Sequence, residues 1–315
     1  MAIKLVFFAT PNIAKQSLIE LNEDPNFEVL AFICQTLKPS GRGNKIIKSE
    51  IMTYAENNNI ETIEVEKISK NIEVIEKLKA FNADFFVTFA FGQMLSQEII
   101  DIPKFGIINL HASLLPKYRG ANPIREPLLN GDKETGVTTM LTSLKMDEGD
   151  ICLTEKIPLT EDTNSIELTE KSSNISPALI KKTLTGLFEG KITPIAQNHN
   201  DATYTKKTQK EDKILNFNEE ATTLHNKIRA LIDNFTCQTT YNGKIVKVLK
   251  TTINKELQGQ AGEVLRVDKQ GILVACKKDS LLIQKIKPEG KGEMDAYSWT
   301  LGSKIKAGDK FDESN

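Results

Sequence analysis

The sequence predicts an α/β fold: a doubly wound, mostly parallel sheet followed by a small β-barrel of the oligonucleotide-binding type. Apolar runs alternate with amphipathic stretches over the first 190 of the 315 residues, as in parallel strands covered by helices on both faces. Short strand signals fill the last hundred residues, as in a small barrel. A polar stretch with a proline lies between the two patterns. We expect a first domain at 1–190, a linker at 191–209 and a barrel domain at 210–315.

Each element of the first region has its own apolar pattern. Continuous apolar runs predict buried strands, and apolar residues three or four positions apart predict helices. The predicted strands are Ile3–Ala9, Phe27–Cys34, Glu61–Val65, Asp84–Phe91, Gly106–Leu110, Gly136–Leu141 and Ile151–Leu159. The predicted helices are Ile13–Leu21, Ile46–Asn57, Ile72–Phe81, Met94–Ile100 and Ser165–Gly190. In such a sheet, ligands bind beyond the carboxyl ends of the strands.

The last region has shorter elements. A helix is expected at Thr222–Ile232, and Asn242-Gly243 is a hairpin signal. The predicted strands are Thr236–Tyr241, Lys244–Lys250, Gly262–Val267, Gly271–Ala275 and Leu281–Ile286.

Composition excludes several classes of protein. The 39% hydrophobic and 26% charged fractions are ordinary for a soluble globular chain. No apolar run approaches the roughly 20 residues of a membrane span, and Met1–Thr10 lacks the pattern of a signal peptide. The four cysteines are scattered without a C-x-x-C pair, which favours reduced thiols in a cytoplasmic protein. We therefore expect a cytoplasmic protein without a membrane partner.

Charge is divided unevenly along the chain. Residues 1–205 hold 21 Lys and Arg against 27 Asp and Glu, whereas residues 206–315 hold 20 against 15. A basic second region favours a polyanionic partner such as nucleic acid, and a solvated lysine-rich surface is the equal alternative.

Glycine placement argues against the common nucleotide-binding loops. The first strand–helix turn, Ala9–Asn12, contains no glycine. Gly41-Arg-Gly43 continues into neither G-x-G-x-x-G nor a P-loop. The first domain is therefore expected to bind something other than NAD or ATP.

Asn109 and His111 are the first candidates for chemistry. They lie two residues apart at the end of a predicted strand, so their side chains share a face at its carboxyl end. An amide donor beside an imidazole can hold a carbonyl oxygen that gains negative charge. An Asn-x-His pair alone is more often structural, with both groups satisfying the backbone.

Charged neighbours strengthen the catalytic interpretation. Lys117-Tyr-Arg-Gly120 supplies cations suited to an anionic substrate. Asp147, Glu148 and Asp150 follow a later strand, and one of them could orient the histidine or accept a proton through water. Only three histidines are present, so we expect no metal.

The motif Asn109-x-His111-x-Ser113-Leu-Leu-Pro116, together with Gly136-Val-Thr138 and Asp147, resembles the 10-formyltetrahydrofolate-dependent formyltransferases. The resemblance implies a catalytic trio of Asn109, His111 and Asp147, with 10-formyltetrahydrofolate as co-substrate. Asn109 and protonated His111 would donate to the oxyanion, and Asp147 would keep the imidazole charged and organise a proton-shuttling water. The implied folate-binding residues are Phe89, Phe91, Gly92, Ser113, Leu114, Leu115 and Pro116.

Further similarities point to the branch that formylates initiator methionyl-tRNA. The opening Lys4–Pro11, the basic loop Gln35–Lys45, the stretch Ala202–Lys207 and the motif Ile286–Lys291 resemble that branch over nearly the whole chain. They imply a tRNA-binding C-terminal barrel. The implied contacts to the RNA are Arg42, Lys45, Lys206 and Lys207.

The sequence departs from the family at two places. Residues 142–146 read Thr-Ser-Leu-Lys-Met where relatives usually have Met-Asp-Glu-Gly-Leu, although the spacing still aligns Asp147 with the catalytic aspartate. Residues 232–236 replace an Asn-Pro-Trp-Pro-Gly run. A formyltransferase for a sugar nucleotide or a ribonucleotide, and a non-catalytic folate- or RNA-binding protein, are the alternatives. We expect a monomer, because no self-complementary apolar face is evident.

Overall fold

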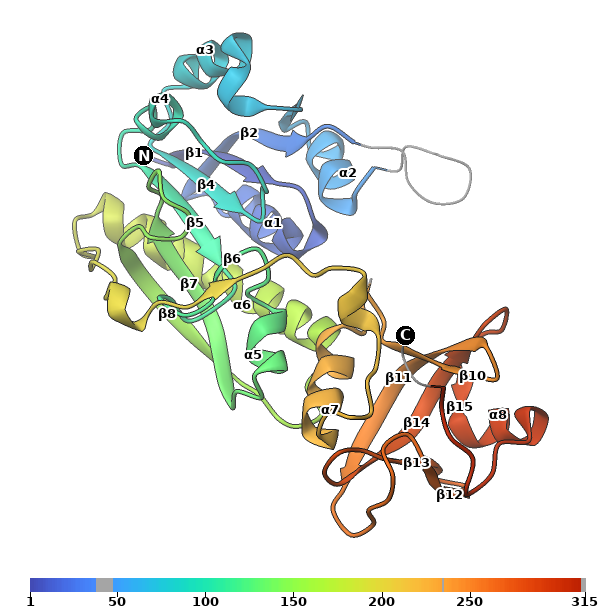
Figure 1. The fold of residues 1–315 in the computed structure, drawn as a ribbon. Helices are drawn as coiled ribbons and strands as arrows, with labels where there is room; N and C mark the ends of the chain where they lie inside the picture. Colours follow the sequence, from blue (N-terminus) through green and yellow to red (C-terminus); the bar gives the residue numbers. More distant parts are fainter. Residues whose placement is uncertain (38–47, 234, 313–315) are drawn as a thin grey trace. The chain divides into compact units, whose positions relative to one another are not determined.

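The computed structural model describes residues 1–37, 48–233 and 235–312 (Figure 1). Its internal contacts divide the chain into two compact units, each with its own hydrophobic core. The first unit comprises Met1–Pro123, Glu134–Pro158 and Thr169–Thr205, and the second comprises Ile124–Lys133, Leu159–Leu168 and Lys206–Asn315. The polar stretch that begins at residue 191 thus packs with the first unit as far as Thr205.

The first unit is built on a seven-stranded sheet with the order β3-β2-β1-β4-β5-β7-β8. The strands are β1 (Ile3–Ala9), β2 (Phe27–Gln35), β3 (Glu61–Val65), β4 (Phe85–Phe89), β5 (Ile107–His111), β7 (Glu134–Leu141) and β8 (Ile151–Pro158). The pairs from β3 to β5 are parallel, whereas β5–β7 and β7–β8 are antiparallel. The predicted mostly parallel α/β sheet is confirmed.

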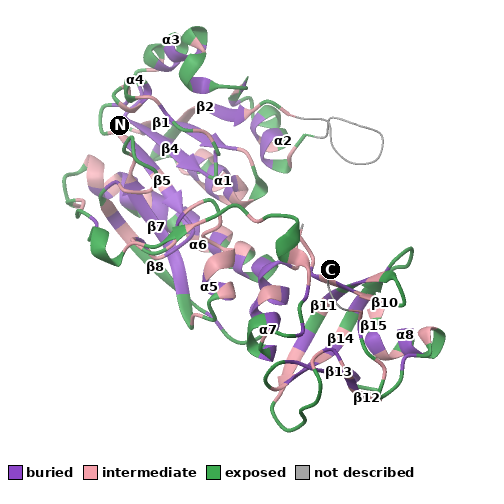
Figure 2. Ribbon diagram, in the orientation of Figure 1, coloured by how far each residue is buried: buried purple, intermediate pink, exposed green. Residues whose placement is uncertain are grey.

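Strand alternation sends side chains to helices on both faces of this sheet. Val6 and Phe8 of β1 pack in one cluster with Val74 and Ile75 of α3. Leu5 and Phe7, at the intervening positions, are also fully buried and therefore face the opposite side, so β1 is covered on both faces over most of its length (Figure 2). The helices are α1 (Lys15–Glu23), α2 (Glu50–Asn57), α3 (Ile72–Ala80), α4 (Gln97–Ile100) and α6 (Ser165–Phe188).

Side-chain caps begin two of these helices. The Ser49 hydroxyl accepts from the backbone N–H of Met52 at the start of α2, and Asn71 Oδ1 accepts from Val74 N–H at the start of α3. Such caps satisfy backbone donors that lack partners in the first turn.

Several elements of the structure have no counterpart in the predicted set, among them strand β15 (Met294–Asp295) and helix α8 (Ala296–Ser303) near the C-terminus and three short elements before them. Strands β6 (Arg119–Gly120) and β9 (Tyr204–Thr205) pair in parallel, and α5 (Arg125–Leu129) is one turn with a proline inside. Two-residue strands carry no periodicity, and a proline argues against a helix, so the sequence pattern could not predict them.

The second unit is an antiparallel sheet with the strand order β10-β11-β14-β13-β12, and β15 pairs with β14. Its strands are β10 (Gln238–Tyr241), β11 (Lys244–Asn254), β12 (Val264–Asp268), β13 (Gly271–Ala275), β14 (Ser280–Pro288) and β15 (Met294–Asp295). All five predicted strands are present. Within the described ranges no ladder joins the edge strands β10 and β12, so closure into a barrel of the oligonucleotide-binding type stays an expectation.

The hairpin between β10 and β11 forms as its sequence predicts. Asn242 and Gly243 have φ values of 52° and 72°, the left-handed conformation that a two-residue hairpin turn requires. Helices α7 (Ala221–Ala230) and α8 (Ala296–Ser303) complete this unit, and Leu224, Ile228 and Trp299 lie in its core.

A buried arginine attaches two earlier segments to α7. Arg229 donates from Nη1 to the backbone oxygens of Thr160 and Thr163, and from Nη2 to that of Leu128. These contacts tie Ile124–Lys133 and Leu159–Leu168 to α7 within the second unit. Among the described residues, no helix is long and apolar enough to cross a membrane.

Candidate active site

Asn109 lies on β5 beside Thr88 of β4. The two residues are direct partners in the parallel ladder, so their side chains emerge on one face. The Thr88 hydroxyl donates to Asn109 Oδ1 over 2.8 Å. With Oδ1 engaged, Nδ2 is the end of the amide that can donate to a substrate oxygen. Asn109 is half-buried.

His111 is the last residue of β5 and is almost fully buried. Its Nε2 lies 2.9 Å from the backbone oxygen of Tyr118. A carbonyl oxygen only accepts, so Nε2 carries the hydrogen and donates. Nδ1 is therefore the nitrogen left to exchange a proton with its surroundings.

Asp147 lies in the loop between β7 and β8. This loop folds back on the end of β7, where the N–H of Leu141 donates to the Asp150 oxygen over 2.9 Å. Gly149 makes the close return possible, because a Cβ at this position would lie only 1.7 Å from the Leu141 oxygen. The fold-back brings Asp147 to the end of the neighbouring strand β5.

The Asp147 carboxylate faces the histidine. Its Oδ2 lies 3.7 Å from His111 Nδ1 and accepts a 2.7 Å hydrogen bond from the backbone N–H of Gly120. The side chains of His111 and Asp147 are 6% and 13% exposed, so their electrostatic interaction is only weakly screened by water. The pair becomes an ion pair whenever the imidazole is protonated.

The predicted folate-binding residues form two groups in the first unit. The first group, Ser113, Leu114, Leu115 and Pro116, begins two residues after the end of β5. The buried Ser113 hydroxyl donates to the Lys117 oxygen over 2.7 Å. Phe89, Phe91 and Gly92 lie at and after the end of β4, with both phenylalanine side chains buried in the core. Contacts from the second group to a ligand would therefore come from the backbone.

Arg119 corrects one interpretation of the sequence. The stretch Lys117–Gly120 was expected to offer its cations to an anionic substrate, but the Arg119 side chain is fully buried. Its guanidinium donates to Gln197 Oε1 over 2.7 Å and 3.1 Å and to the Tyr204 hydroxyl over 3.0 Å. The arginine thus serves the fold, while Lys117 is exposed.

Sequence reasoning missed Thr88, Gly120 and Gln197. A threonine in a buried strand, a glycine in a turn and a single glutamine are ordinary residues there. The one available signal was the position of Thr88 three residues before Phe91, on the strand expected to border the ligand.

The structure describes two of the four predicted RNA-binding residues. Arg42 and Lys45 fall outside the described residues. Lys206 and Lys207 directly follow β9 and are exposed.

The second unit has a groove with a cavity volume of about 530 Å³ that four exposed lysines help to line. Lys247 and Lys250 of β11 lie opposite Lys287 and Lys285 of β14 in the antiparallel ladder. Like charges directly opposite one another destabilise a sheet. Acidic residues line the groove as well, namely Asp162, Glu167, Asp233 and Glu293.

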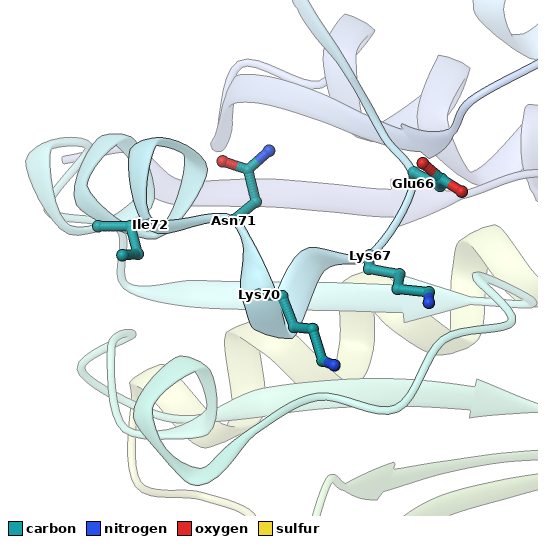
Figure 3. Close-up of a pocket in the computed structure, with 5 residues that line it drawn as sticks. All are labelled: Glu66, Lys67, Lys70, Asn71 and Ile72. Carbon is teal, nitrogen blue, oxygen red and sulfur yellow. The ribbon is translucent and has the colours of Figure 1, made fainter.

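A further pocket, of about 410 Å³, lies in the first unit between β3 and α3. It is lined by Glu66, Lys67, Lys70, Asn71 and Ile72, all from one stretch of chain (Figure 3). None of the predicted catalytic residues lines it. Within the described parts of the chain, no group of three His, Cys, Asp or Glu side chains could hold a metal ion.

Two family models match the chain, one after the other along the sequence. Residues 3–184 match the model of the formyl transferase family, and residues 207–304 match the model described as formyl transferase, C-terminal domain. The chain belongs to the formyl transferase family.

Within this family, the chain is similar to methionyl-tRNA formyltransferases over nearly its full length. The chain is 40% identical over 291 residues to a methionyl-tRNA formyltransferase of Clostridium botulinum, covering 92% of this chain and 93% of the relative. It is 38% identical over 307 residues to the methionyl-tRNA formyltransferase of Clostridioides difficile, with 97% and 99% covered.

Solved structures show the same fold. The sugar 3N-formyl transferase WlaRD, determined in the presence of dTDP and 5-N-formyl-THF, has a TM-score of 0.69 at 21% identity and covers 93% of this chain and 100% of its own. HypX from Aquifex aeolicus, in complex with tetrahydrofolic acid, has a TM-score of 0.65 at 14% identity over 95% of this chain and 47% of its own.

Proposed function

We propose that this protein transfers the formyl group of 10-formyltetrahydrofolate to the α-amino group of initiator methionyl-tRNA, for translation initiation. The full-length similarity to methionyl-tRNA formyltransferases carries the proposal. The pairing of His111 with Asp147 beside Asn109 supports it, because formyl transfer needs these chemical groups. Such a reaction belongs where translation begins, so we propose a cytoplasmic protein. We propose a monomer as well, which light scattering on the purified chain would test.

The residues at the end of β5 fit a formyl donor. The folate would supply the formyl group, held by backbone groups around Phe89, Phe91 and Gly92 and by Ser113–Pro116. Asn109 would donate from Nδ2 to the formyl oxygen as negative charge develops there. His111, when protonated at Nδ1, would be a second donor.

Asp147 would take part in the transfer of the proton that must leave the amine. The α-amine of an aminoacyl ester is less basic than that of the free amino acid, so a useful fraction is neutral near pH 7. No strong base is then required. Asp147, with an ordered water, would move the proton from the amine nitrogen towards the folate nitrogen, and its charge would stabilise the imidazolium of His111.

Basic residues would bind the tRNA phosphates. We propose Arg42, Lys45, Lys206 and Lys207 as contacts, together with the lysines of the groove in the second unit. The two cross-strand lysine pairs support this addition, since a sheet gains no stability from facing like charges. Such contacts position the RNA without reading its sequence. Arg42→Ala should raise KM for the tRNA and reduce the salt dependence of binding.

One assay tests the proposed reaction. The purified chain is incubated with 10-formyltetrahydrofolate and charged initiator tRNA, with charged elongator methionyl-tRNA and an amino-sugar nucleotide as parallel substrates. We expect formylation of the initiator tRNA alone. Formylation of the amino sugar would instead support a sugar N-formyltransferase, and no transfer to any acceptor would support a binding protein.

Variants of the proposed trio test the residue roles. Asn109→Ala and His111→Ala should lower kcat by about two to three powers of ten and leave tRNA affinity nearly unchanged. More than a tenth of the activity in His111→Ala would contradict its assignment.

A further inference from the structure

Gln197 is a buried residue of the connecting stretch that uses every hydrogen-bonding atom of its side chain. It is 6% exposed. Its Nε2 donates to the backbone oxygens of Asp147 and Gly149 over 2.9 Å and 2.7 Å. Its Oε1 accepts from Nε and Nη2 of Arg119 over 3.1 Å and 2.7 Å. The glutamine thus joins the loop that carries Asp147 to a buried arginine.

The two neighbours of Arg119 in the chain contact the catalytic candidates His111 and Asp147. Its neighbour Tyr118 accepts from His111 Nε2 through its backbone oxygen, and its other neighbour Gly120 donates from its backbone N–H to Asp147 Oδ2. A closed ring therefore runs from the Asp147 backbone through Gln197 and Arg119 to Gly120 and back to the Asp147 carboxylate. Both ends of Asp147 are fixed by this ring.

The stretch around Gln197 is itself anchored to the segment 118–120. The backbone N–H of Arg119 donates to the Thr203 oxygen over 2.9 Å, and the Tyr118 N–H donates to the Thr203 hydroxyl over 2.8 Å. Tyr204 adds the hydroxyl that accepts from Arg119 and itself donates to Glu148 Oε1 over 3.2 Å. All of these residues belong to the first unit.

The conformation of Asp147 shows why such a ring is needed. Its φ of 55° lies in the left-handed region, which is uncommon for a residue with a Cβ and which Asp adopts more readily than most. A strained backbone persists only where its surroundings hold it. Two side-chain donors from Gln197 on the carbonyls of Asp147 and Gly149 supply such a constraint.

We propose that Gln197 is a positioning residue for formyl transfer, holding Asp147 at the distance from His111 that the reaction requires. The proposal rests on the proposed function and extends it to a residue outside the trio. The stretch after α6 would then be part of the catalytic machinery as well as a connection between the two units.

Gln197→Glu distinguishes the two sets of hydrogen bonds that this side chain makes, those to Arg119 and those to the loop of Asp147. A carboxylate still accepts from Arg119, as an ion pair, but it has no hydrogen to donate and faces two carbonyl oxygens. The anchoring of the arginine is thereby kept while the hold on Asp147 is lost. We expect kcat to fall about a hundredfold, the scale set by a misplacement of about 1 Å, with KM for the folate nearly unchanged. Asn200→Ala, which removes an exposed amide three residues away, should keep wild-type kcat.

A double-mutant cycle distinguishes positioning from a general structural role. If Gln197 acts through the Asp147 carboxylate, Gln197→Glu should lower kcat less than threefold in an Asp147→Asn background. A full hundredfold loss of kcat in that background would overturn the proposal. So would a kcat of Gln197→Glu alone that lies within threefold of the wild type.

Hydrogen exchange provides a readout that needs no formyl transfer. Amides of residues 145–150 should exchange faster in Gln197→Glu than in the wild type, whereas Asn200→Ala should leave them unchanged. An inactive wild-type protein with this exchange difference would contradict the proposed function and retain the positioning role of Gln197. Equal exchange in all three proteins would overturn that role.

Discussion

The backbone N–H of Gly120 donates a 2.7 Å hydrogen bond to Oδ2 of Asp147, the same oxygen that lies 3.7 Å from Nδ1 of His111. A peptide group from another segment therefore sets the carboxylate against the imidazole. Gly120 has a φ of 108°, which a residue with a Cβ rarely adopts, so the donor position depends on glycine.

The first prediction separates the position of Asp147 from its charge. Asp147→Asn retains an oxygen that can accept from Gly120 but removes the negative charge beside His111. We expect kcat to fall by about two to three powers of ten, while thermal unfolding stays within a few degrees of the wild type. Asp147→Ala should lose at least as much activity. An Asn variant with near-wild-type kcat would show that the charge has no role.

The second prediction concerns the orientation of Asn109. Thr88→Val replaces the buried hydroxyl with a methyl group of similar size, so the fold should persist while the amide loses the donor to its Oδ1. We expect kcat to fall about tenfold, less than for Asn109→Ala, because the donor itself is still present. Thr88→Ser keeps the hydroxyl and is the matched control. Equal kcat for the Val and Ser variants would exclude this role.

Repeating patterns explain which elements the sequence could predict. The strand Ile3–Ala9 was predicted at its observed bounds, and Ser165 begins the long helix as expected, because each rests on an apolar pattern that runs over several residues. The hairpin turn followed from Asn242-Gly243. The contacts that hold Asp147 could not be predicted, because they join Arg119 to residues about 80 positions away through single side chains.

The role of Arg119 could not be predicted from the sequence for the same reason. A guanidinium after a strand end can bind a substrate anion or pair with groups of the fold itself, and the sequence is the same in both cases. The positions of Gln197, Tyr204 and the Glu148 carboxylate, 3.5 Å from Arg119 Nη1, decide for the second. For Thr88 the sequence lacked a different piece of information. Its partner Asn109 was predicted as a site residue, but the register that pairs the two strands was not known.

The third prediction tests the paired lysines of the second unit. Lys287→Gln removes one charge from the Lys247–Lys287 cross-strand pair. We expect a higher KM for charged tRNA. The slope of log K against log salt should be smaller in magnitude by about 1, because one phosphate contact and the counterions that it releases are lost. The free energy of unfolding should rise by a few tenths of a kcal/mol, since a repulsion is removed.

Lys269→Gln is the control for this experiment. Lys269 is exposed in the turn between β12 and β13, outside the lysine groove, and its substitution changes the net charge by the same amount. Equal salt slopes for both variants would show that net charge, and not the groove, governs RNA binding.

The fourth prediction concerns pH and the thiols. Burial raises the pKa of Cys34, Cys237 and Cys276 to about 12 and that of Cys152 to about 11. The folded protein should therefore resist alkylation at pH 8, whereas four thiols should react in denaturant, as counted by mass spectrometry.

The same pKa shifts set a stability window. An unfolded thiol ionises near pH 9, so between pH 9 and 12 the unfolded chain binds fewer protons than the folded one, and stability falls as pH rises. Cys237 shares a core with Trp299, the only tryptophan, so tryptophan fluorescence during urea unfolding reports on its surroundings. Because Cys237→Ala lacks this ionisation, the stability advantage of the wild type over the variant should shrink above pH 9, by at most about 1.4 kcal/mol per pH unit. A difference that stays constant from pH 8 to 10.5 would show that the Cys237 thiol ionises equally well in the folded protein.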